Sequence, residues 1–124
     1  MNENEVYQQF LKDNPSTGIL KVQIFMAEQA IPIPNVNITI EKEVSKIELN
    51  FFEGITDESG IISNIILPAP VIKNSDEPEY VTYELIVKHP NYLGPTTFQV
   101  PIYSGQKMIQ YVTLVPKPKE NKNG

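Results

Sequence analysis

The chain contains no cysteine and no arginine among its 124 residues, and all ten of its basic residues are lysines. Without cysteine it can form no disulfide, no thiolate metal site and no cysteine nucleophile. Without arginine it has no planar guanidinium to hold a carboxylate or a phosphate by two parallel hydrogen bonds. These two absences exclude several of the commonest kinds of binding and catalytic site.

Basic charge is also scarce, because fifteen acidic residues leave a formal net charge of −5. A nucleic-acid-binding protein needs a basic surface and commonly uses arginine on phosphates and guanine, so nucleic acid is excluded as a partner. No apolar run approaches the roughly 20 residues of a membrane span. The opening "MNENEVYQQF" has no basic region and no apolar core of a signal peptide. We therefore expect a cytoplasmic protein, or one whose targeting sequence lies outside this chain.

Eleven prolines and several Gly, Asn and Asp clusters divide the chain into short pieces rich in Ile, Val, Tyr, Phe and Thr. Apolar and polar residues alternate within these pieces, as is typical of half-buried strands bounded by turns. The pattern predicts seven strands, over residues 18–27, 36–43, 46–57, 61–68, 80–89, 96–103 and 108–116. Seven such strands predict an all-β fold, a two-sheet β-sandwich.

Three parts of the chain are expected to differ. Residues 1–16 predict an N-terminal arm or a short helix, because Val6 and Phe10 recur at helical spacing before the breaker "DNPSTG". Residues 17–116 form the predicted sandwich, in which a change of phase at Phe52 indicates a β-bulge. Residues 117–124, "KPKENKNG", contain no apolar side chain other than proline and predict a flexible tail or linker.

Asp57 and Glu58 are adjacent carboxylates in "GITDESG" and are candidates for a cation site or an acid–base pair. Neighbouring residues of an extended chain point to opposite sides, and the spaced ligands of a calcium loop are missing. We therefore predict a structural turn, the corner of a β-hairpin, in which Asp57 caps backbone amides and Gly60 supplies a positive φ.

The other candidates for chemistry are few. His89 is the only histidine, and no Gly-x-Ser-x-Gly motif supplies a serine for it to activate. Lys21 lies on the polar phase of its strand, which argues against a lysine–asparagine isopeptide bond in the core. No catalytic residue, cofactor or metal site is therefore predicted.

Aromatic side chains give a different candidate, since tyrosines stack on sugar rings and anchor interfaces. Tyr83 shares the inward phase of its strand, and we assign it to the core. The candidate surface-binding residues are Tyr80, Tyr92, Tyr103 and Tyr111. An exposed sheet edge would also allow weak self-association.

Four segments in fixed order resemble one family. They are "GILKVQIFMAEQAIPIPNVNITI", "TDESGIISNIILPAP", "TYELIVKHPNY" and "VPIYSGQKMIQYVTLVP", which together lie within residues 17–116. They resemble carboxypeptidase-regulatory-like, or transthyretin-like, β-sandwich domains. More narrowly, the "LPAP" and closing segments resemble the N-terminal domain of spore-former peptidoglycan-associated proteins, including spore cortex-lytic enzymes.

The resemblance implies a prealbumin-like sandwich with an accessory, non-catalytic role. It also implies a cell-wall or spore association, as a scaffold, pro-region or interaction domain with a protein or peptidoglycan partner. Two enzymatic relatives of the fold do not fit, because hydroxyisourate hydrolases need several histidines and an arginine, and intradiol dioxygenases need two histidines. The alternative prediction is a glycan- or peptide-binding module that uses the surface tyrosines.

Overall fold

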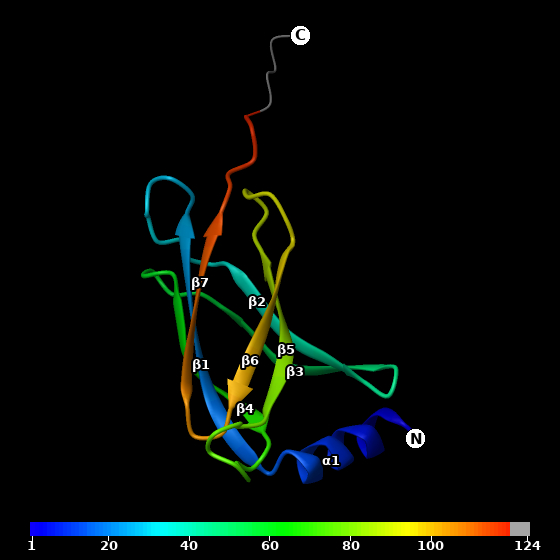
Figure 1. Cartoon of the computed structure of the whole chain (residues 1–124). Coiled ribbons are helices and arrows are strands. Elements are labelled where there is room, and N and C mark those ends of the chain that lie inside the picture. The colour runs from blue at the N-terminus through cyan, green and yellow to red at the C-terminus, as the bar shows by residue number, and fades with distance from the viewer. Residues whose placement is uncertain (120–124) are drawn as a thin grey trace.

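The computed structural model describes residues 1–119, which form one helix and seven strands (Figure 1). In chain order the elements are α1 (Glu3–Asp13), β1 (Ser16–Met26), β2 (Asn37–Val44), β3 (Ile47–Ile55), β4 (Ile61–Ala69), β5 (Tyr80–Lys88), β6 (Thr96–Tyr103) and β7 (Lys107–Leu114). The predicted fold class, a seven-stranded two-sheet prealbumin-like sandwich with a short N-terminal helix, is confirmed.

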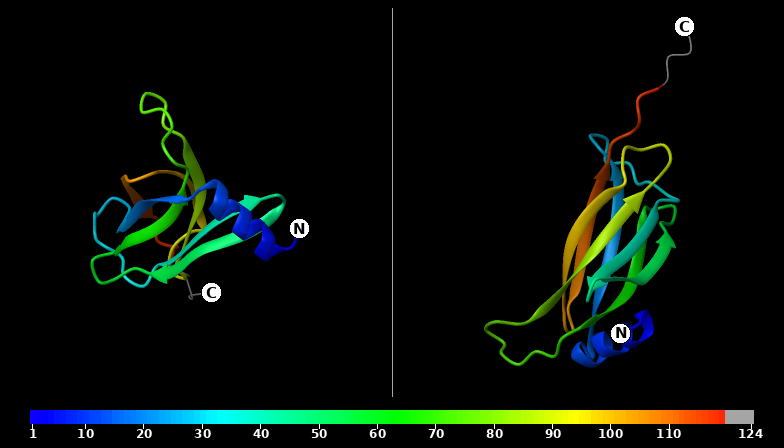
Figure 2. Two further views of the ribbon diagram at one scale, coloured as in Figure 1. Left: turned by 90° about the horizontal axis from the view of Figure 1, so that it is seen from below. Right: turned by 90° about the vertical axis from the view of Figure 1, so that its right-hand side faces the viewer.

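The strands divide into two sheets that face one another (Figures 1 and 2). The three-stranded sheet has the order β4-β1-β7, and the four-stranded sheet has the order β3-β2-β5-β6. All neighbours are antiparallel except β1 and β7, which run parallel over eight residue pairs from Ile19–Lys107 to Met26–Leu114. The first and last strands of the chain therefore lie side by side.

The hydrophobic core fills the space between the two sheets, as the alternation predicts. Leu20, Val22 and Ile24 of β1 and Ile38 and Ile40 of β2 belong to this core, and all five side chains are fully buried. Alternate residues of β5, β6 and β7 belong to the same core; they are Val81, Tyr83, Leu85, Val87, Val100, Ile102, Val112 and Leu114.

Helix α1 lies across the lower end of the sandwich and closes it (Figure 2). Asn2 caps the helix, since its side-chain oxygen accepts a hydrogen bond from the Glu5 amide at 2.9 Å. Val6 and Phe10 are buried on one face, and the Phe10 ring lies 5.2 Å from the ring of Phe51 on β3. Burying these two side chains ties the N-terminal segment to the sandwich core.

The phase change predicted at Phe52 corresponds to a bulge one residue earlier. Phe52 lies opposite Ile40, and Asn50 lies opposite the next residue, Glu41, so Phe51 has no partner on β2. The extra residue lets Phe51 turn toward Tyr83, with the two ring centroids 5.1 Å apart and nearly perpendicular. A second register shift, between Leu20 and Val22 where β1 meets β4, was not predicted.

The hairpin predicted at residues 56–60 is wrong, because β3 pairs with β2 and β4 pairs with β1. The turn instead carries the chain from one sheet to the other. Thr56 exchanges backbone hydrogen bonds with residues 35 and 36, whereas the Gly60 carbonyl accepts from Ile24 of β1. The two sides of the turn are therefore held by different sheets. A turn motif alone does not tell which strands will pair.

The last described residues continue to pair after β7 ends. The Leu93 amide donates to the Val115 carbonyl at 2.8 Å, and the Lys117 amide donates to the Asn91 carbonyl at 3.0 Å. Residues 120–124 of the predicted tail lie outside the described residues. Across residues 1–119, the single helix is too short and too polar to traverse a lipid bilayer.

Candidate functional site

The Asp57 carboxylate is occupied by the backbone of its own turn. Its Oδ1 accepts hydrogen bonds from the amides of Ser59 and Ile61, both at 2.9 Å, while Glu58 is exposed. Gly60 has a φ of +73°, and a Cβ at this position would lie 2.5 Å from the Ile24 carbonyl oxygen. Both the conformation and the space at residue 60 require glycine.

Thr56 fixes this turn from the inside of the molecule. Its side chain is buried, and its hydroxyl donates to the Ile33 carbonyl at 2.8 Å and accepts from the Val36 amide at 3.0 Å. A buried hydroxyl that donates one hydrogen bond and accepts another orients its surroundings, and it has no hydrogen left to donate to a ligand. Residues 56–60 are thus a structural corner between the two sheets.

His89 lies at the opposite end of β5 from Tyr80, far along the sandwich from the N-terminal helix. Its Nδ1 accepts a hydrogen bond from the Asn91 amide at 3.1 Å, and its ring meets the Tyr92 ring edge-on at 5.1 Å. The imidazole therefore has a local role in the turn after β5. Within residues 1–119, no hydrogen bond joins the imidazole to Asp57 or Glu58.

The four candidate tyrosines do not form one surface. Tyr80 and Tyr103 are directly opposite on β5 and β6, with ring centroids 5.1 Å apart. Tyr92 is half-buried and packs against the core beyond the other end of β5, whereas Tyr111 is exposed on β7 of the other sheet. Only Tyr80 and Tyr103 could contact one ligand together, and Tyr103 is itself half-buried.

Tyr83 belongs to the core, with its hydroxyl donating to the Pro68 carbonyl at 2.5 Å. Burial, with a smaller contribution from Tyr7, raises the pKa of Tyr83 well above the ordinary value of a phenol. The hydrogen bond joins β5 of one sheet to β4 of the other, so this polar group serves the packing of the two sheets.

Lys21 is half-buried on β1, between the fully buried Leu20 and Val22. Its partner position on β7 is Ile109, an exposed residue, so Lys21 lies on the outer face of the three-stranded sheet. The lysine is thus placed away from the core, where an internal crosslink would have to form.

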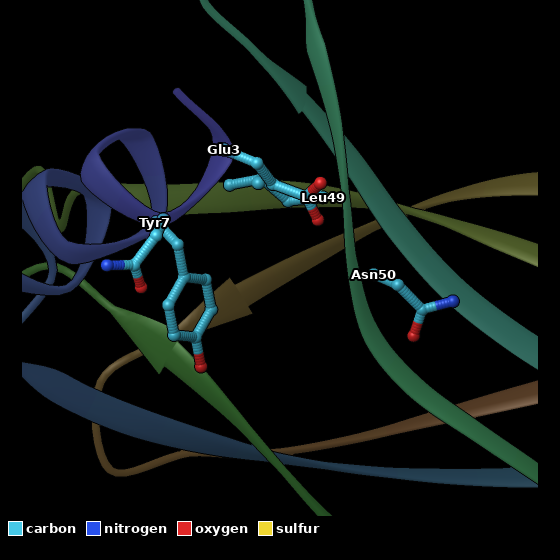
Figure 3. Close-up of a pocket in the computed structure, with 5 residues that line it drawn as sticks. Glu3, Tyr7, Leu49 and Asn50 are labelled. Atoms are coloured by element: carbon cyan, nitrogen blue, oxygen red, sulfur yellow. The ribbon is translucent and has the colours of Figure 1, made fainter. Parts of the chain in front are cut away.

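The hollows described on the surface of residues 1–119 are open. One of about 420 Å³ lies between the start of α1 and β3 and is lined by Glu3, Asn4, Tyr7, Leu49 and Asn50. Figure 3 shows Tyr7 descending from the helix while Asn50 points away from it on the neighbouring strand. The lining has one carboxylate and no convergent set of polar groups, so this hollow resembles a packing gap beneath the helix.

Several exposed apolar side chains lie on the outer face of the three-stranded sheet. Ile19, Ile66 and Ile109 occupy its three strands, and Ile66 is 64% exposed. Tyr111 is 59% exposed beside them on β7. A hollow of about 350 Å³ lies at one end of this face, lined by residues that include Phe25 and Thr113. The sequence carried a signal for this surface, because these isoleucines occupy the outward phase, where polar residues are usual.

The outer face of the four-stranded sheet is acidic. Glu41 lies directly opposite Glu84, and Glu43 lies directly opposite Glu48. Partial desolvation, a hydrogen bond shared with Glu41 and the negative charges of Glu41 and Glu43 raise the pKa of Glu48. Like charges in cross-strand pairs destabilise a sheet, so this face is electrostatically strained.

Within residues 1–119, no three His, Asp or Glu side chains are grouped so that they could hold a metal ion. No family model matches the chain, and no curated protein matches it either. The likeness to known proteins is therefore one of fold.

Solved structures share this fold at low sequence identity. The minor pilin GBS52 of Streptococcus agalactiae superposes with a TM-score of 0.57 at 16% identity, covering 88% of this chain and 48% of that one. The shaft pilin SpaA of Lactobacillus rhamnosus GG gives 0.56 at 15% identity, covering 83% and 52%. This chain spans about half the length of either pilin.

An enzyme has the same architecture. The 5-hydroxyisourate hydrolase of Klebsiella pneumoniae superposes with a TM-score of 0.53 at 13% identity, covering 82% of this chain and 92% of that one. The fold is therefore shared by pilins and by a hydrolase, so the likeness alone does not distinguish a structural role from an enzymatic one. The decision depends on the residues of this chain.

Proposed function

We propose that the chain is a non-catalytic β-sandwich module of a cell-wall- or spore-associated, peptidoglycan-processing protein. In this role it acts as a scaffold, pro-region or interaction domain. The observation that carries the proposal is that the side chains best suited to chemistry are engaged in local structure. The Asp57 carboxylate holds two backbone amides of its turn, and the His89 ring accepts from the Asn91 amide.

The surface supports the same proposal. One outer face has exposed isoleucines and the other has paired glutamates, and the hollow between α1 and β3 is open. Such faces suit contacts with other macromolecules better than the enclosure of a small substrate. The fold shared with two pilins agrees with a structural role. The cell-wall and spore association rests on the resemblance of the sequence segments.

The proposal is tested by incubating the purified chain with insoluble spore cortex and vegetative peptidoglycan and measuring released reducing ends and amino groups. We expect no release above buffer, and no difference between the native chain and the variants Asp57→Asn and His89→Gln. Release that the native chain catalyses and either variant loses would refute the non-catalytic role. Circular dichroism of each variant shows whether the fold is retained.

A second function is favoured by one observation, the close pair Tyr80 and Tyr103. The rings are cross-strand neighbours at the end of the four-stranded sheet, beside the polar loop 71–79. Two adjacent aromatic rings give a platform on which a sugar ring or a peptide can pack. We propose a glycan- or peptide-binding module as the alternative function.

Co-sedimentation with insoluble peptidoglycan tests this alternative. The expected result is that the native chain is retained and that Tyr80→Ala reduces retention by about tenfold, since the ring is exposed and its loss leaves the core intact. Tyr111→Ala, which removes an exposed tyrosine from the other sheet, serves as the matched control. Equal retention of both variants, or no retention of the native chain, would contradict the platform.

A further inference from the structure

The four edge strands of the sandwich differ in how they are protected. Three of them carry devices that hinder the pairing of another strand. Strand β4 has Pro68 and a positive φ at Asn64, strand β6 has Pro101, and strand β3 has the bulge at Phe51 and contacts α1. Each of these features interrupts a regular row of backbone donors and acceptors.

Strand β7 has no such device among its eight residues, "KMIQYVTL". Its register with β1 is unbroken, and its residues are mostly β-branched, aromatic or unbranched apolar. The only charge is Lys107 at its first position. By the criteria that describe edge protection in natural sheets, β7 is the open edge of this molecule.

The hydrogen bonds to β1 show which backbone groups of β7 remain available. The Ile19 amide donates to the Gln106 carbonyl and the Ala27 amide to the Leu114 carbonyl, so the even-numbered residues of β7 face β1. In a parallel ladder the alternate residues point the other way. Residues 107, 109, 111 and 113 therefore direct their N–H and C=O groups to the free side, where no backbone partner is recorded within residues 1–119.

The row of outward-facing N–H and C=O groups on β7 is short and is closed at both ends. Above it, the Val115 carbonyl accepts from Leu93, which closes the edge at that end. Below it, the chain turns back into β6 through residues 104–106. What remains open runs from Lys107 to Thr113 and includes Tyr111, whose carbonyl also accepts from the Gln110 side chain at 3.0 Å. A carbonyl oxygen has two lone pairs, so that contact still allows an inter-strand bond.

The charges around β7 favour contact between two identical copies. Strands β1, β4 and β7 contain no aspartate or glutamate, and their only charged residues are Lys21 and Lys107. The glutamates of the other sheet lie on β2, β3 and β5. Two β7 edges can therefore approach without opposing carboxylates, although the whole chain carries a net charge of −5.

We propose that β7 pairs antiparallel with β7 of a second copy about a two-fold axis at Tyr111. The two three-stranded sheets then become one six-stranded sheet, with the order β4-β1-β7-β7-β1-β4. Tyr111 lies opposite Tyr111 of the other copy, and Ile109 lies opposite its Thr113. Pairs of this kind on the exposed side add to the backbone bonds. The accessory role proposed above does not require this pairing, so the two stand or fall separately.

The absence of native cysteine allows a direct test of the axis. In the proposed pairing the two copies of residue 111 form a hydrogen-bonded pair with Cα atoms about 5.5 Å apart, within the range that a disulfide spans. Under mild oxidation Tyr111→Cys should form a disulfide-linked dimer as its main product. Ile55→Cys, at a 60% exposed position on the protected edge β3, is the matched control and should stay largely monomeric. Equal crosslinking of both variants would overturn the proposal.

Sedimentation equilibrium tests the same contact in the chain without added cysteine. The mass should rise from 14.0 kDa toward twice that value with concentration. Tyr111→Pro removes an edge amide that does not serve β1, and Tyr111→Glu keeps that amide but sets two carboxylates on the axis. Both should lower the association constant about tenfold or more. A monomer at concentrations up to about 1 mM, or a dimer that neither variant weakens, overturns the proposal.

Discussion

The two sheets of this sandwich share one core and present opposite outer faces. The strands of the three-stranded sheet have no acidic residue, and isoleucines at positions 19, 66 and 109 are exposed on it. The strands of the four-stranded sheet carry five glutamates, at positions 41, 43, 48, 53 and 84. Both inner faces are apolar and form the core, whereas the two outer faces present different chemistry to the solvent.

The corner at residue 60 joins the two sheets, so a substitution that disrupts it should have the largest effect on stability. Gly60→Ala is expected to lower the free energy of unfolding by about 2–4 kcal/mol, because it combines backbone strain with a clash. Gly105→Ala is the matched control, since Gly105 has a φ of +70° but no atom within 4 Å of an added Cβ. It should cost about 1 kcal/mol. Urea unfolding followed by circular dichroism measures both, and equal losses would contradict the clash.

The Tyr83 hydroxyl is a second link between the sheets. Tyr83→Phe removes its hydrogen bond to Pro68 and leaves that carbonyl without the bond, which should cost about 1–2 kcal/mol. Tyr7→Phe removes a hydroxyl for which no hydrogen bond is recorded within residues 1–119 and should change stability by less than about 0.5 kcal/mol. The same unfolding experiment compares them. A Tyr83→Phe chain as stable as the native one would show that the bond does not hold the sheets together.

The acidic face should become more stable when one of its paired charges is removed. Glu84→Gln eliminates the repulsion from Glu41 opposite and should raise the free energy of unfolding by about 0.5 kcal/mol. On the other sheet, Lys107→Gln has no like-charged partner opposite and should have little effect. The difference should shrink in 1 M salt, where the Debye length is about 3 Å. Destabilisation by Glu84→Gln would mean that the glutamates are held by favourable contacts.

The smallest expected effect concerns the pH dependence of Glu48. Its pKa is raised in the folded chain, so the folded state binds this proton more tightly than the unfolded state does. The contribution of Glu48 to the free energy of unfolding is therefore fully present at a pH below its pKa in the unfolded chain. It is lost as the pH rises through its pKa in the folded chain. Glu48→Gln should be more stable than the native chain at pH 7 and equal to it near pH 4. Thermal unfolding at both pH values checks this, and a pH-independent difference would refute it.

Alternation within the chain was enough to predict the strands and most of the core. Leu20, Val22 and Ile24 are buried as their phase requires, and the structure has the short helix that was one of the two forms predicted for the N-terminus. These features are local, since a residue's phase is set by its nearest neighbours along the strand. The strand ends lie within two residues of the predicted ones, and pairing and bulges decide the limits.

Pairing between strands was not predictable in the same way. The motif "TDESG" specified a turn, but its hydrogen bonds to Ile24 on one side and to residues 35 and 36 on the other assign β4 and β3 to different sheets. The tyrosines show the same limit, because positions 80, 92, 103 and 111 are similar in sequence context but lie in three separate places. Phase predicts which side of a strand a residue occupies, and only the topology tells what lies next to it.

The parallel pairing of β1 with β7 has a mechanical consequence. Because the two strands run in the same direction, the chain enters the three-stranded sheet at one end and leaves it at the other (Figure 1). Tension applied through the flanking segments therefore pulls β1 and β7 past one another along their length. The hydrogen bonds between eight residue pairs are then loaded together instead of being opened in succession. Such shear geometry opposes forced unfolding, whose rate is set by the unfolding barrier.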